Sequence, residues 1–219
     1  MESPQTQQQT YGNMFQQAQN MISNLFSSKF PLISVKSTVD GQMYRVRDLP
    51  DKQEAANLLA TVRRKLTSLC DTLEKKYPDK PQVQMIKKNF RSDPMRFLEA
   101  TPESNHTSYS VNKGESIHLC LRQRQATDES LVKADVIIFV ALHELAHVCT
   151  ESVGHDATFW NNFGWLLQEA EAAGVYQRQN FQAHPASYCG IYITDSPSYD
   201  ATKDGNDNSI GRMFLRASK

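Results

Sequence analysis

The spacing of apolar residues along the chain predicts several helices. The most regular pattern lies between Asp51 and Pro78, where apolar residues recur with the 3.6-residue period of an α-helix. Asp51 and Glu54 form a capping-box pattern at its start, and Pro78 cannot continue the helix. The apolar positions are Ala55, Leu58, Leu59, Val62, Leu66, Leu69 and Leu73. We therefore expect a long helix here, with one face packed against a core.

Shorter patterns predict four further helical segments. A helix is expected around Val83–Phe90, and residues 93–98 begin with an Asp-Pro pair that favours one turn of helix. Residues 127–152 contain a continuous apolar run, whose residues 136–138 alone could equally form a strand; the motif at residues 143–147, described below, favours a long helix. Asp156 is a typical N-cap for another helix, which Gly174 would end.

Alternation of apolar and polar residues predicts two hairpins and one late strand. Residues 32–46 read as a hairpin that turns at Asp40-Gly41 through a two-residue loop. Residues 107–121 predict a second hairpin, and residues 188–194 a last short strand. Hairpins and helices that occur in separate segments are typical of an α+β fold with a small antiparallel or mixed sheet.

Composition divides the chain into a central domain and two polar ends. Residues 1–34 combine a Gln-rich tail with an uncharged amphipathic segment, residues 35–197 carry the predicted domain, and residues 198–219 form a polar C-terminal tail. The amphipathic segment could pack on its own domain or dock on a partner or a membrane surface. No transmembrane segment is expected, because the longest apolar run, Val136–Leu142, is far shorter than the ~20 residues of a membrane span.

The charge distribution bears on contact with nucleic acid, and the cysteine spacing bears on the cellular compartment. The 24 basic and 24 acidic residues cancel overall, but residues 29–100 hold 15 basic and 9 acidic residues. Contact with nucleic acid through the basic 45–91 region is therefore one interpretation, and an ordinary solvated helix face is the other. The four cysteines are widely spaced, which favours reduced thiols in a cytosolic or nuclear protein over a disulfide framework.

Residues 143–147 read His-Glu-Leu-Ala-His, which is an HExxH motif. On a helix, His143 and His147 stand one turn apart on the same face, where both imidazoles can bind one Zn²⁺. Glu144 is placed beside them and can take a proton from a water molecule that the metal activates. The motif therefore predicts a zinc site for hydrolysis, with Glu144 as the general base.

A catalytic zinc site needs a third protein ligand, and several residues compete for this role. His155 is favoured, because Gly154 before it lets the chain turn back toward the metal. Glu169 could serve if its helix packs antiparallel to the HExxH helix. Glu151 and Asp156 are less favourably placed, because a straight helix carries Glu151 about 6 Å further along the axis.

The motif and the residues after it resemble a known protein family. The HELAH sequence at 143–147, the Gly-His-Asp at 154–156, the Phe159-Trp160 pair and a Leu-rich helix with Glu169 are similar to WLM-type zinc metallopeptidases. These are relatives of the Spartan- and SprT-type proteases, and the likeness is strongest to short versions from large DNA viruses, algae and protists.

The resemblance implies a zincin-like, minigluzincin-type domain that hydrolyses protein or peptide bonds with one Zn²⁺. It implies that His143, His147 and His155 are metal ligands and that Glu144 is the general base. One departure is that seven residues separate His147 and His155, where the family pattern has five. We expect another half-turn of helix to absorb the difference. If the chain is viral, the resemblance also makes association with the virion an expectation.

Other residues are weaker candidates for the site. Tyr188, Tyr192 and His184 could polarise an oxyanion or contact substrate, although late aromatic residues more often fill a core. His118 lies in the predicted strand Ser116–Leu121, which we expect to be the edge that binds an extended substrate. The alternative to a peptidase is an inactive metal-binding interaction or virion-associated protein that docks through its N-terminal amphipathic segment.

Overall fold

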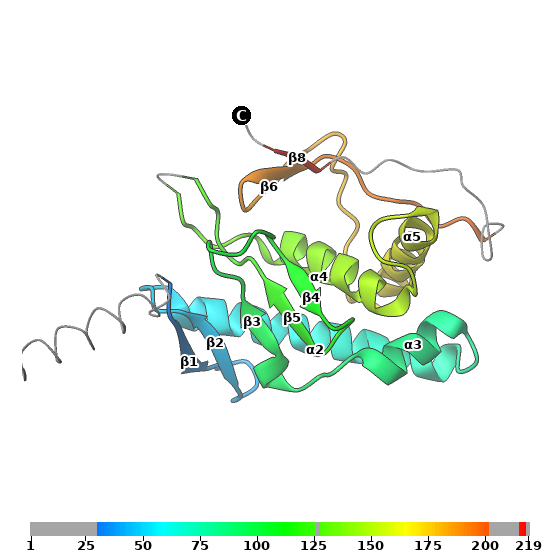
Figure 1. Ribbon diagram of the computed structural model, residues 1–219, viewed down its shortest axis with the longest axis horizontal. Helices are drawn as coiled ribbons and strands as arrows, with labels where there is room; N and C mark the ends of the chain where they lie inside the picture. Colours follow the sequence, from blue (N-terminus) through cyan, green and yellow to red (C-terminus); the bar gives the residue numbers. More distant parts are fainter. Residues whose placement is uncertain (1–29, 126–127, 202–214, 218–219) are drawn as a thin grey trace, which may run out of the picture. The chain divides into compact units, whose positions relative to one another are not determined.

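The computed structural model describes residues 30–125 and 128–201, together with the backbone of residues 215–217. All of these except residues 30 and 31 belong to the unit Leu32–Lys219, whose elements are labelled in Figure 1. The Gln-rich and amphipathic segment expected within residues 1–34 lies almost wholly outside the described residues. Among the described residues, no helix is both long enough and apolar enough to span a membrane.

A mixed five-stranded sheet forms one layer of this unit (Figure 1). Its strands are β1 (Leu32–Lys36), β2 (Met43–Arg47), β3 (Phe97–Glu99), β4 (Tyr109–Val111) and β5 (Ser116–Leu119). Their order is β1-β2-β3-β5-β4; β3 is parallel to both neighbours, and the two hairpins are antiparallel. The predicted α+β class is therefore confirmed, with β4 at one edge of the sheet.

The helices pack against this sheet and against one another (Figure 1). They are α2 (Lys52–Lys76), α3 (Pro81–Asn89), the 3₁₀ turn η1 (Pro94–Arg96), α4 (Ala134–Cys149) and α5 (Ala157–Ala172). α2 contacts β1, β2 and β3, whereas α4 contacts β4 and β5. The regular apolar pattern of α2 explains most of its packing, because six of the seven predicted positions are buried and Leu58 is partly buried. Ala56, Ala60 and Cys70 are buried as well.

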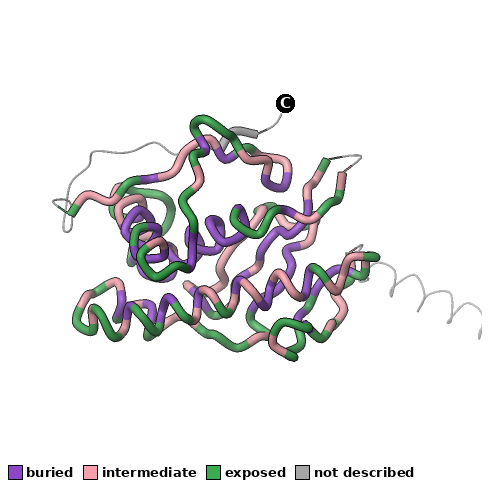
Figure 2. Tube along the Cα trace, turned by 180° about the vertical axis from the view of Figure 1, so that it is seen from behind, coloured by how far each residue is buried: buried purple, intermediate pink, exposed green. Residues whose placement is uncertain are grey.

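Helix α4 lies at the centre of the core. Every residue from 136 to 146 is buried, and Figure 2 shows the tube purple along most of this helix. α4 contacts α2, α3 and α5 as well as the sheet. A helix that is apolar on all sides is stable in water only when it is enclosed in this way. The core therefore fixes the position of the motif that α4 carries.

A smaller antiparallel sheet completes the unit (Figure 1). It contains β6 (Ala186–Tyr188), β7 (Ile191–Ile193) and β8 (Leu215–Ala217). We expected one strand over residues 188–194, but the chain reverses at Cys189 and Gly190, whose φ angles are +50° and +88°. Residues 215–217, expected in a polar tail, pair with β7.

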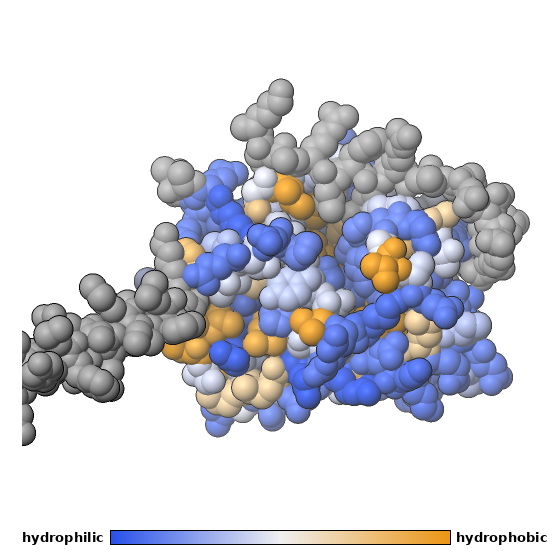
Figure 3. Space-filling model, viewed as in Figure 1, coloured by the Kyte–Doolittle hydropathy of each residue, from blue (hydrophilic) through white to orange (hydrophobic). Residues whose placement is uncertain are grey.

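The exposed surface is largely hydrophilic on the face that Figure 3 shows, with apolar residues in small separate groups. Within the part of the chain that the structure describes, the exposed large apolar residues are Val39, Met43, Met95, Val153 and Tyr192. Val153 is 93% exposed and lies in the loop after α4. Single exposed apolar residues of this kind are common on the surfaces of folded proteins.

Three local expectations differ from the structure. The β1–β2 hairpin is closed by a longer loop than two residues, because its pairing stops at Lys36 and Met43. Phe97 and Leu98 belong to the buried strand β3, not to a turn of helix. α4 starts at Ala134 instead of near residue 127, since the segment before it pairs with residues 122–125. In each case the pairing with another segment, near or distant in the sequence, overrides the local pattern.

A buried charge cluster explains why the capping box is not used. The Asp51 carboxylate makes no capping hydrogen bond and contacts Arg122 at 2.7 Å. The Arg122 guanidinium also contacts Glu99, and both side chains are 1% exposed. The second Glu99 oxygen accepts a hydrogen bond of 2.7 Å from the backbone amide of Arg47. The cluster thus joins α2 to β2, β3 and the segment after β5.

Two of the four cysteines form a disulfide, so the expectation of four reduced thiols is wrong. Cys120, directly after β5, is bonded to Cys189 in the β6–β7 turn, with their Cα atoms 6.4 Å apart. Cys70 and Cys149 are free and buried. The bonded pair is separated by 69 positions, and such a spacing carries no pairing signal in the sequence.

Candidate metal centre and active site

Three histidine side chains converge at the C-terminal end of α4. His143 and His147 lie one turn apart on this helix, and His155 follows in the loop before α5. The Nε2 atom of His155 is 3.1 Å from that of His147 and 3.1 Å from that of His143. A tetrahedral ion about 2.0–2.1 Å from each nitrogen would set these separations at about 3.3 Å. The three residues therefore fit one zinc ion with little adjustment.

The loop between His147 and His155 is held by side chains from other elements. α4 ends at Cys149, so the longer spacing is absorbed by a loop and not by the extra half-turn of helix that we expected. The Lys113 ammonium donates to the backbone carbonyls of Thr150, at 2.8 Å, and Ser152, at 3.3 Å, and also contacts that of Glu151. The turn back toward α4 occurs at Gly154, whose φ is +95°.

The end of α4 is fixed by Thr150. Its hydroxyl donates to the Ala146 carbonyl at 2.7 Å and accepts a hydrogen bond of 2.9 Å from the Asn162 amide on α5. At the start of α5, the Asp156 side chain accepts from the backbone amide of Phe159 at 2.8 Å, so the predicted N-cap is confirmed. These bonds position both ends of the loop that carries the third histidine.

Aromatic rings enclose the histidines on the α5 side. The His155 ring stacks against Trp160 at 5.4 Å, and the Phe159 ring lies 4.3 Å from that of His147. The Phe159 ring is also within 5 Å of the rings of His143 and His155. These contacts limit the rotation of the imidazoles.

Desolvation favours the neutral form of the three imidazoles, although His155 itself is exposed. Desolvation is the largest cause that lowers the pKa of each of these histidines, and it brings the pKa of His147 to about 4. Charge repulsion among the histidines adds to the effect at His143 and His147. The His143 Nδ1 atom is buried without a hydrogen-bond partner among the described residues. Neutral imidazole is the form that binds a divalent cation.

Glu144 is buried next to the histidines. Its side chain lies in the interior, with only 4% of the residue exposed. Burial raises its pKa to about 8, while a hydrogen bond from the Ser110 backbone acts in the opposite direction. Ser110 belongs to β4, so the edge of the main sheet runs beside this carboxyl group.

A cavity of about 500 Å³ connects these groups. Its walls come from α4, from the loop that carries His155, from residues 106–110 in and before β4, and from β7. Tyr188 also lines it, and its hydroxyl forms a hydrogen bond with that of Ser108. The volume falls within the range of about 300–1,000 Å³ that is usual for ligand sites.

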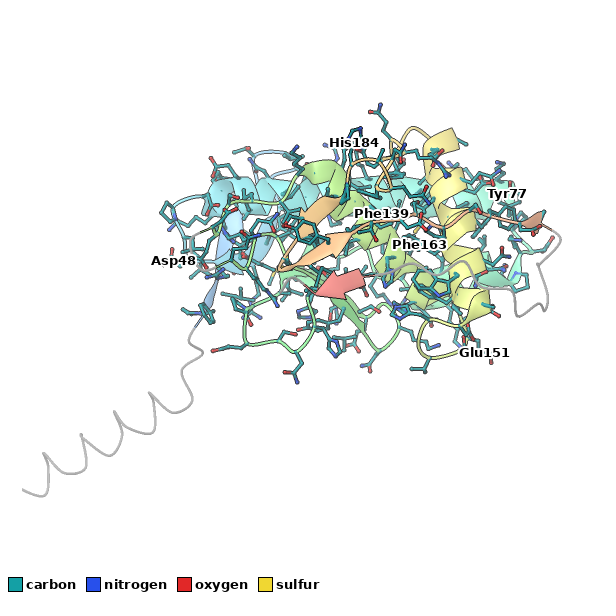
Figure 4. The ribbon with its side chains drawn as sticks, turned by 90° about the horizontal axis from the view of Figure 1, so that it is seen from above. Asp48, Tyr77, Phe139, Glu151, Phe163 and His184 are labelled. Atoms are coloured by element: carbon teal, nitrogen blue, oxygen red, sulfur yellow. A yellow bond between two sulfur atoms is a disulfide. The ribbon has the colours of Figure 1, made fainter. Side chains whose placement is uncertain are left out.

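The structure brings His143, Glu144, His147, His155 and Tyr188 together and leaves the other candidates outside. The residues that do not line the cavity are Tyr192, His184 and His118. Tyr192 is 41% exposed. Figure 4 shows His184 at the margin of the unit. His118 lies on β5 and stacks on Tyr109 with ring centroids 4.5 Å apart.

The competing candidates for the third ligand are engaged elsewhere. The Glu169 carboxylate is bound by the Lys76 ammonium at 2.9 Å and the Tyr77 hydroxyl at 2.8 Å. Glu151 lies at the outer edge of the unit in Figure 4, and the Asp156 side chain caps α5. Among the described residues, the group of possible metal ligands that includes this motif consists of the three histidines.

The strand that we expected to bind substrate at the sheet edge, Ser116–Leu121, is not an edge strand, and the role of Lys113 was not predicted. β5 lies inside the sheet between β3 and β4, so β4 is the edge beside the cavity. Lys113 could not be found from the sequence, because its acceptors are backbone carbonyls and carry no residue signature. The neighbouring Gly114 was a visible turn signal, and its φ is +114°.

Part of the basic 45–91 region is engaged within the protein. The Arg63 guanidinium contacts the Asp40 carboxylate at 2.9 Å. The Lys65 ammonium donates to the Val175 carbonyl at 2.6 Å. Contact between nucleic acid and the remaining basic side chains stays a prediction.

Comparison with known proteins supports the resemblance seen in the motif. A family model described as WLM domain matches residues 39–214. The uncharacterized protein R325 of Acanthamoeba polyphaga mimivirus is 32% identical over 165 residues, which cover 74% of this chain and 82% of that protein. The uncharacterized protein 136R of Invertebrate iridescent virus 6 is 36% identical over 69 residues, or 32% of this chain and 38% of that protein.

Among solved structures, the crystal structure of Wss1 from Saccharomyces cerevisiae is similar over 59% of this chain and 87% of that chain, with a TM-score of 0.42 and 24% identity. The family model spans most of the chain and includes all three histidines and Glu144. The expected family is therefore confirmed: the chain belongs to the WLM domain family.

Proposed function

We propose that this protein is a zinc-dependent peptidase that hydrolyses protein or peptide bonds. His143, His147 and His155 would hold one Zn²⁺, and Glu144 would act as the general base. The observation that carries the proposal is the convergence of three imidazole nitrogens beside a buried carboxyl group in one cavity. A purely structural zinc site would have no need of Glu144.

When bound, the ion would supply a Lewis acid that lowers the pKa of water and polarises the substrate carbonyl. A cation held beside Glu144 would favour the ionised form of its carboxyl group and lower the pKa that burial raises. The Glu144 carboxylate would then take the proton from the attacking water and pass it to the leaving nitrogen. The enclosure of Glu144 by α4 and β4 fixes the direction from which it acts. The aromatic rings of α5 pack against the imidazoles and hold them in place.

The substrate would lie in an extended conformation along β4. This strand is the sheet edge beside Glu144, and residues 107–110 line the cavity. An extended peptide adds readily to an exposed strand edge through backbone hydrogen bonds. Tyr188 also lines the cavity, with its hydroxyl bonded to that of Ser108, and we propose that this hydroxyl contacts the substrate carbonyl oxygen during the reaction.

Glu144→Gln is the variant that tests this function. We expect the wild-type protein to cleave a denatured protein substrate and the variant to bind zinc but lose turnover. His184→Ala serves as the matched control, because His184 lies outside the cavity, and it should keep full activity. Cleavage by Glu144→Gln at the wild-type rate would refute the proposed role.

A further inference from the structure

Two hydroxyl groups form a hydrogen-bonded pair in the wall of the cavity. Ser108 and Tyr188 both line it, and their side-chain oxygens are bonded to each other. Ser108 comes directly before the edge strand β4, and Tyr188 is the last residue of β6. Ser108 is partly buried, whereas Tyr188 is 1% exposed. The pair therefore links the strand edge proposed for substrate binding to the smaller sheet.

The oxygen atoms of this pair are held in place by the backbone and by the disulfide. The backbone amide of Cys120 donates a hydrogen bond of 2.9 Å to the Ser108 hydroxyl. Cys120 is bonded to Cys189, which follows Tyr188 directly in the chain. Each member of the pair is thus anchored next to the same covalent link. A hydroxyl group held in this way can change the direction of its proton without moving its oxygen.

The pair carries more protons than the bond within it uses. A hydroxyl group has one proton and two lone pairs that accept hydrogen bonds. The Cys120 amide occupies one lone pair of Ser108, so the other lone pair and the proton of Ser108 remain for Tyr188. Either hydroxyl can be the donor in the bond between them. One proton is therefore always left over, on Tyr188 when Ser108 donates and on Ser108 when Tyr188 donates.

The two arrangements suit two stages of the reaction. Without a substrate, the enclosed Tyr188 proton needs an acceptor, because a buried hydroxyl without one is costly, and Ser108 provides it. When negative charge develops on a carbonyl oxygen beside Tyr188, the Tyr188 proton turns to that oxygen and Ser108 donates to Tyr188 instead. Each hydroxyl keeps its own proton, so no covalent bond changes. A backbone carbonyl in place of Ser108 could only accept, and would hold the Tyr188 proton away from the substrate.

We propose that Ser108 is a positioning residue that acts through Tyr188. It accepts the Tyr188 proton in the free protein and donates to the Tyr188 oxygen when the substrate carbonyl oxygen becomes charged. This inference rests on the proposed peptidase function and on the substrate contact of Tyr188, and it assigns the partner that makes this contact possible. The pKa of Tyr188 agrees with a donor at Ser108, since burial raises that pKa and the hydrogen bond with Ser108 acts in the opposite direction.

Four variants and one control test this role. Ser108→Ala removes the partner, Ser108→Thr keeps a hydroxyl, Tyr188→Phe removes the group through which Ser108 acts, and the fourth variant combines Ser108→Ala with Tyr188→Phe. Ser116→Ala is the matched control, because its hydroxyl lies on β5, 3.1 Å from the His118 Nε2 atom and outside the cavity lining. The Tm of each variant shows whether it folds, and Ser108→Gly replaces Ser108→Ala if that variant does not.

The experiment measures kcat and KM of the zinc-loaded full chain on a peptide identified from the fragments of a denatured protein. We expect Tyr188→Phe to lower kcat by about 100-fold. Ser108→Ala should lower kcat by about 3- to 10-fold with KM nearly unchanged, because its bond to Tyr188 matters most in the transition state. Ser108→Thr and Ser116→Ala should retain the wild-type kcat. In the Tyr188→Phe background, Ser108→Ala should cause no further loss.

The double variant separates positioning from a structural effect. If Ser108→Ala lowers kcat by the same factor with and without the Tyr188 hydroxyl, Ser108 does not act through Tyr188 and the inference is overturned. A loss in Ser108→Thr as large as that in Ser108→Ala would overturn it as well. Both results leave the peptidase standing, since the wild-type protein still cleaves the peptide. Absence of cleavage by the zinc-loaded wild-type protein would instead refute the peptidase and, with it, the role of Ser108.

Discussion

The disulfide between Cys120 and Cys189 should contribute strongly to stability. It joins the end of β5 to the β6–β7 turn across 69 positions. Loop-closure entropy for a link of this length corresponds to about 4 kcal/mol at 25 °C, and measured values for disulfides are about 2–4 kcal/mol. We therefore expect reduction to lower the free energy of unfolding by about 2–4 kcal/mol.

Urea unfolding with and without dithiothreitol measures this contribution. The double variant Cys120→Ala/Cys189→Ala should be insensitive to dithiothreitol, and Cys70→Ala should respond as the wild type does, because Cys70 is a free thiol. Titration of thiols in the unfolded, unreduced protein should find two. Four titratable thiols, or an unfolding midpoint that dithiothreitol does not change, would refute the disulfide.

The bond also has a consequence for the site. The β6–β7 hairpin carries Tyr188 and the isoleucines of the cavity wall. Its other attachments include Gln123, whose side chain bonds to the Ser187 carbonyl at 3.0 Å and accepts from the Cys189 amide at 3.1 Å. Because the hairpin is short, we expect reduction to lower kcat/KM before the protein as a whole unfolds.

Three further variants test other parts of the account. Arg122→Met leaves Glu99 buried without its partner, so urea unfolding should show a loss of about 3–5 kcal/mol, and a loss below 1 kcal/mol contradicts this. Gly114→Ala should lower Tm, because its Cβ would lie 2.9 Å from Val148 at a φ of +114°; an unchanged Tm would argue against that contact. Lys113→Met frees the loop before His155, so chelator competition should show about 10- to 100-fold weaker zinc binding, whereas unchanged affinity would show that the loop holds itself.

The sequence was sufficient to predict the helices that position the site. The period of α2, the apolar run of α4 and the Asp156 cap of α5 are local signals, and the structure has all three elements. The i and i+4 spacing in the HExxH motif places His143 and His147 on one face, as the geometry of any α-helix requires.

The remaining features depend on contacts between distant segments. Phe97 and Leu98 become a central strand because β2 and β5 lie on either side of them. β4 is the edge instead of β5 because the second hairpin adds to β3 through its second strand. The disulfide forms because the fold brings the end of β5 to the β6–β7 turn. None of these pairings leaves a periodic pattern in the sequence.

The candidate site likewise combines features that local sequence predicts with features that depend on distant contacts. Gly154 before His155 indicated that the chain turns back toward the metal, and the structure has a φ of +95° there. The residues that hold this loop, Lys113 and Asn162, lie outside the motif. Lys113 donates to the Thr150 backbone carbonyl, and Asn162 donates to the Thr150 hydroxyl. Such contacts depend on position in three dimensions and not on residue type.

The central claim is that three histidines, and not Glu169, form the metal site. The most direct test is the zinc content of the purified protein and of His155→Ala and Glu169→Gln, measured by mass spectrometry of the metal. We expect one zinc ion per chain in the wild type and in Glu169→Gln, and a loss of most of it in His155→Ala. Full zinc content in His155→Ala, or its loss in a folded Glu169→Gln protein, would contradict the account.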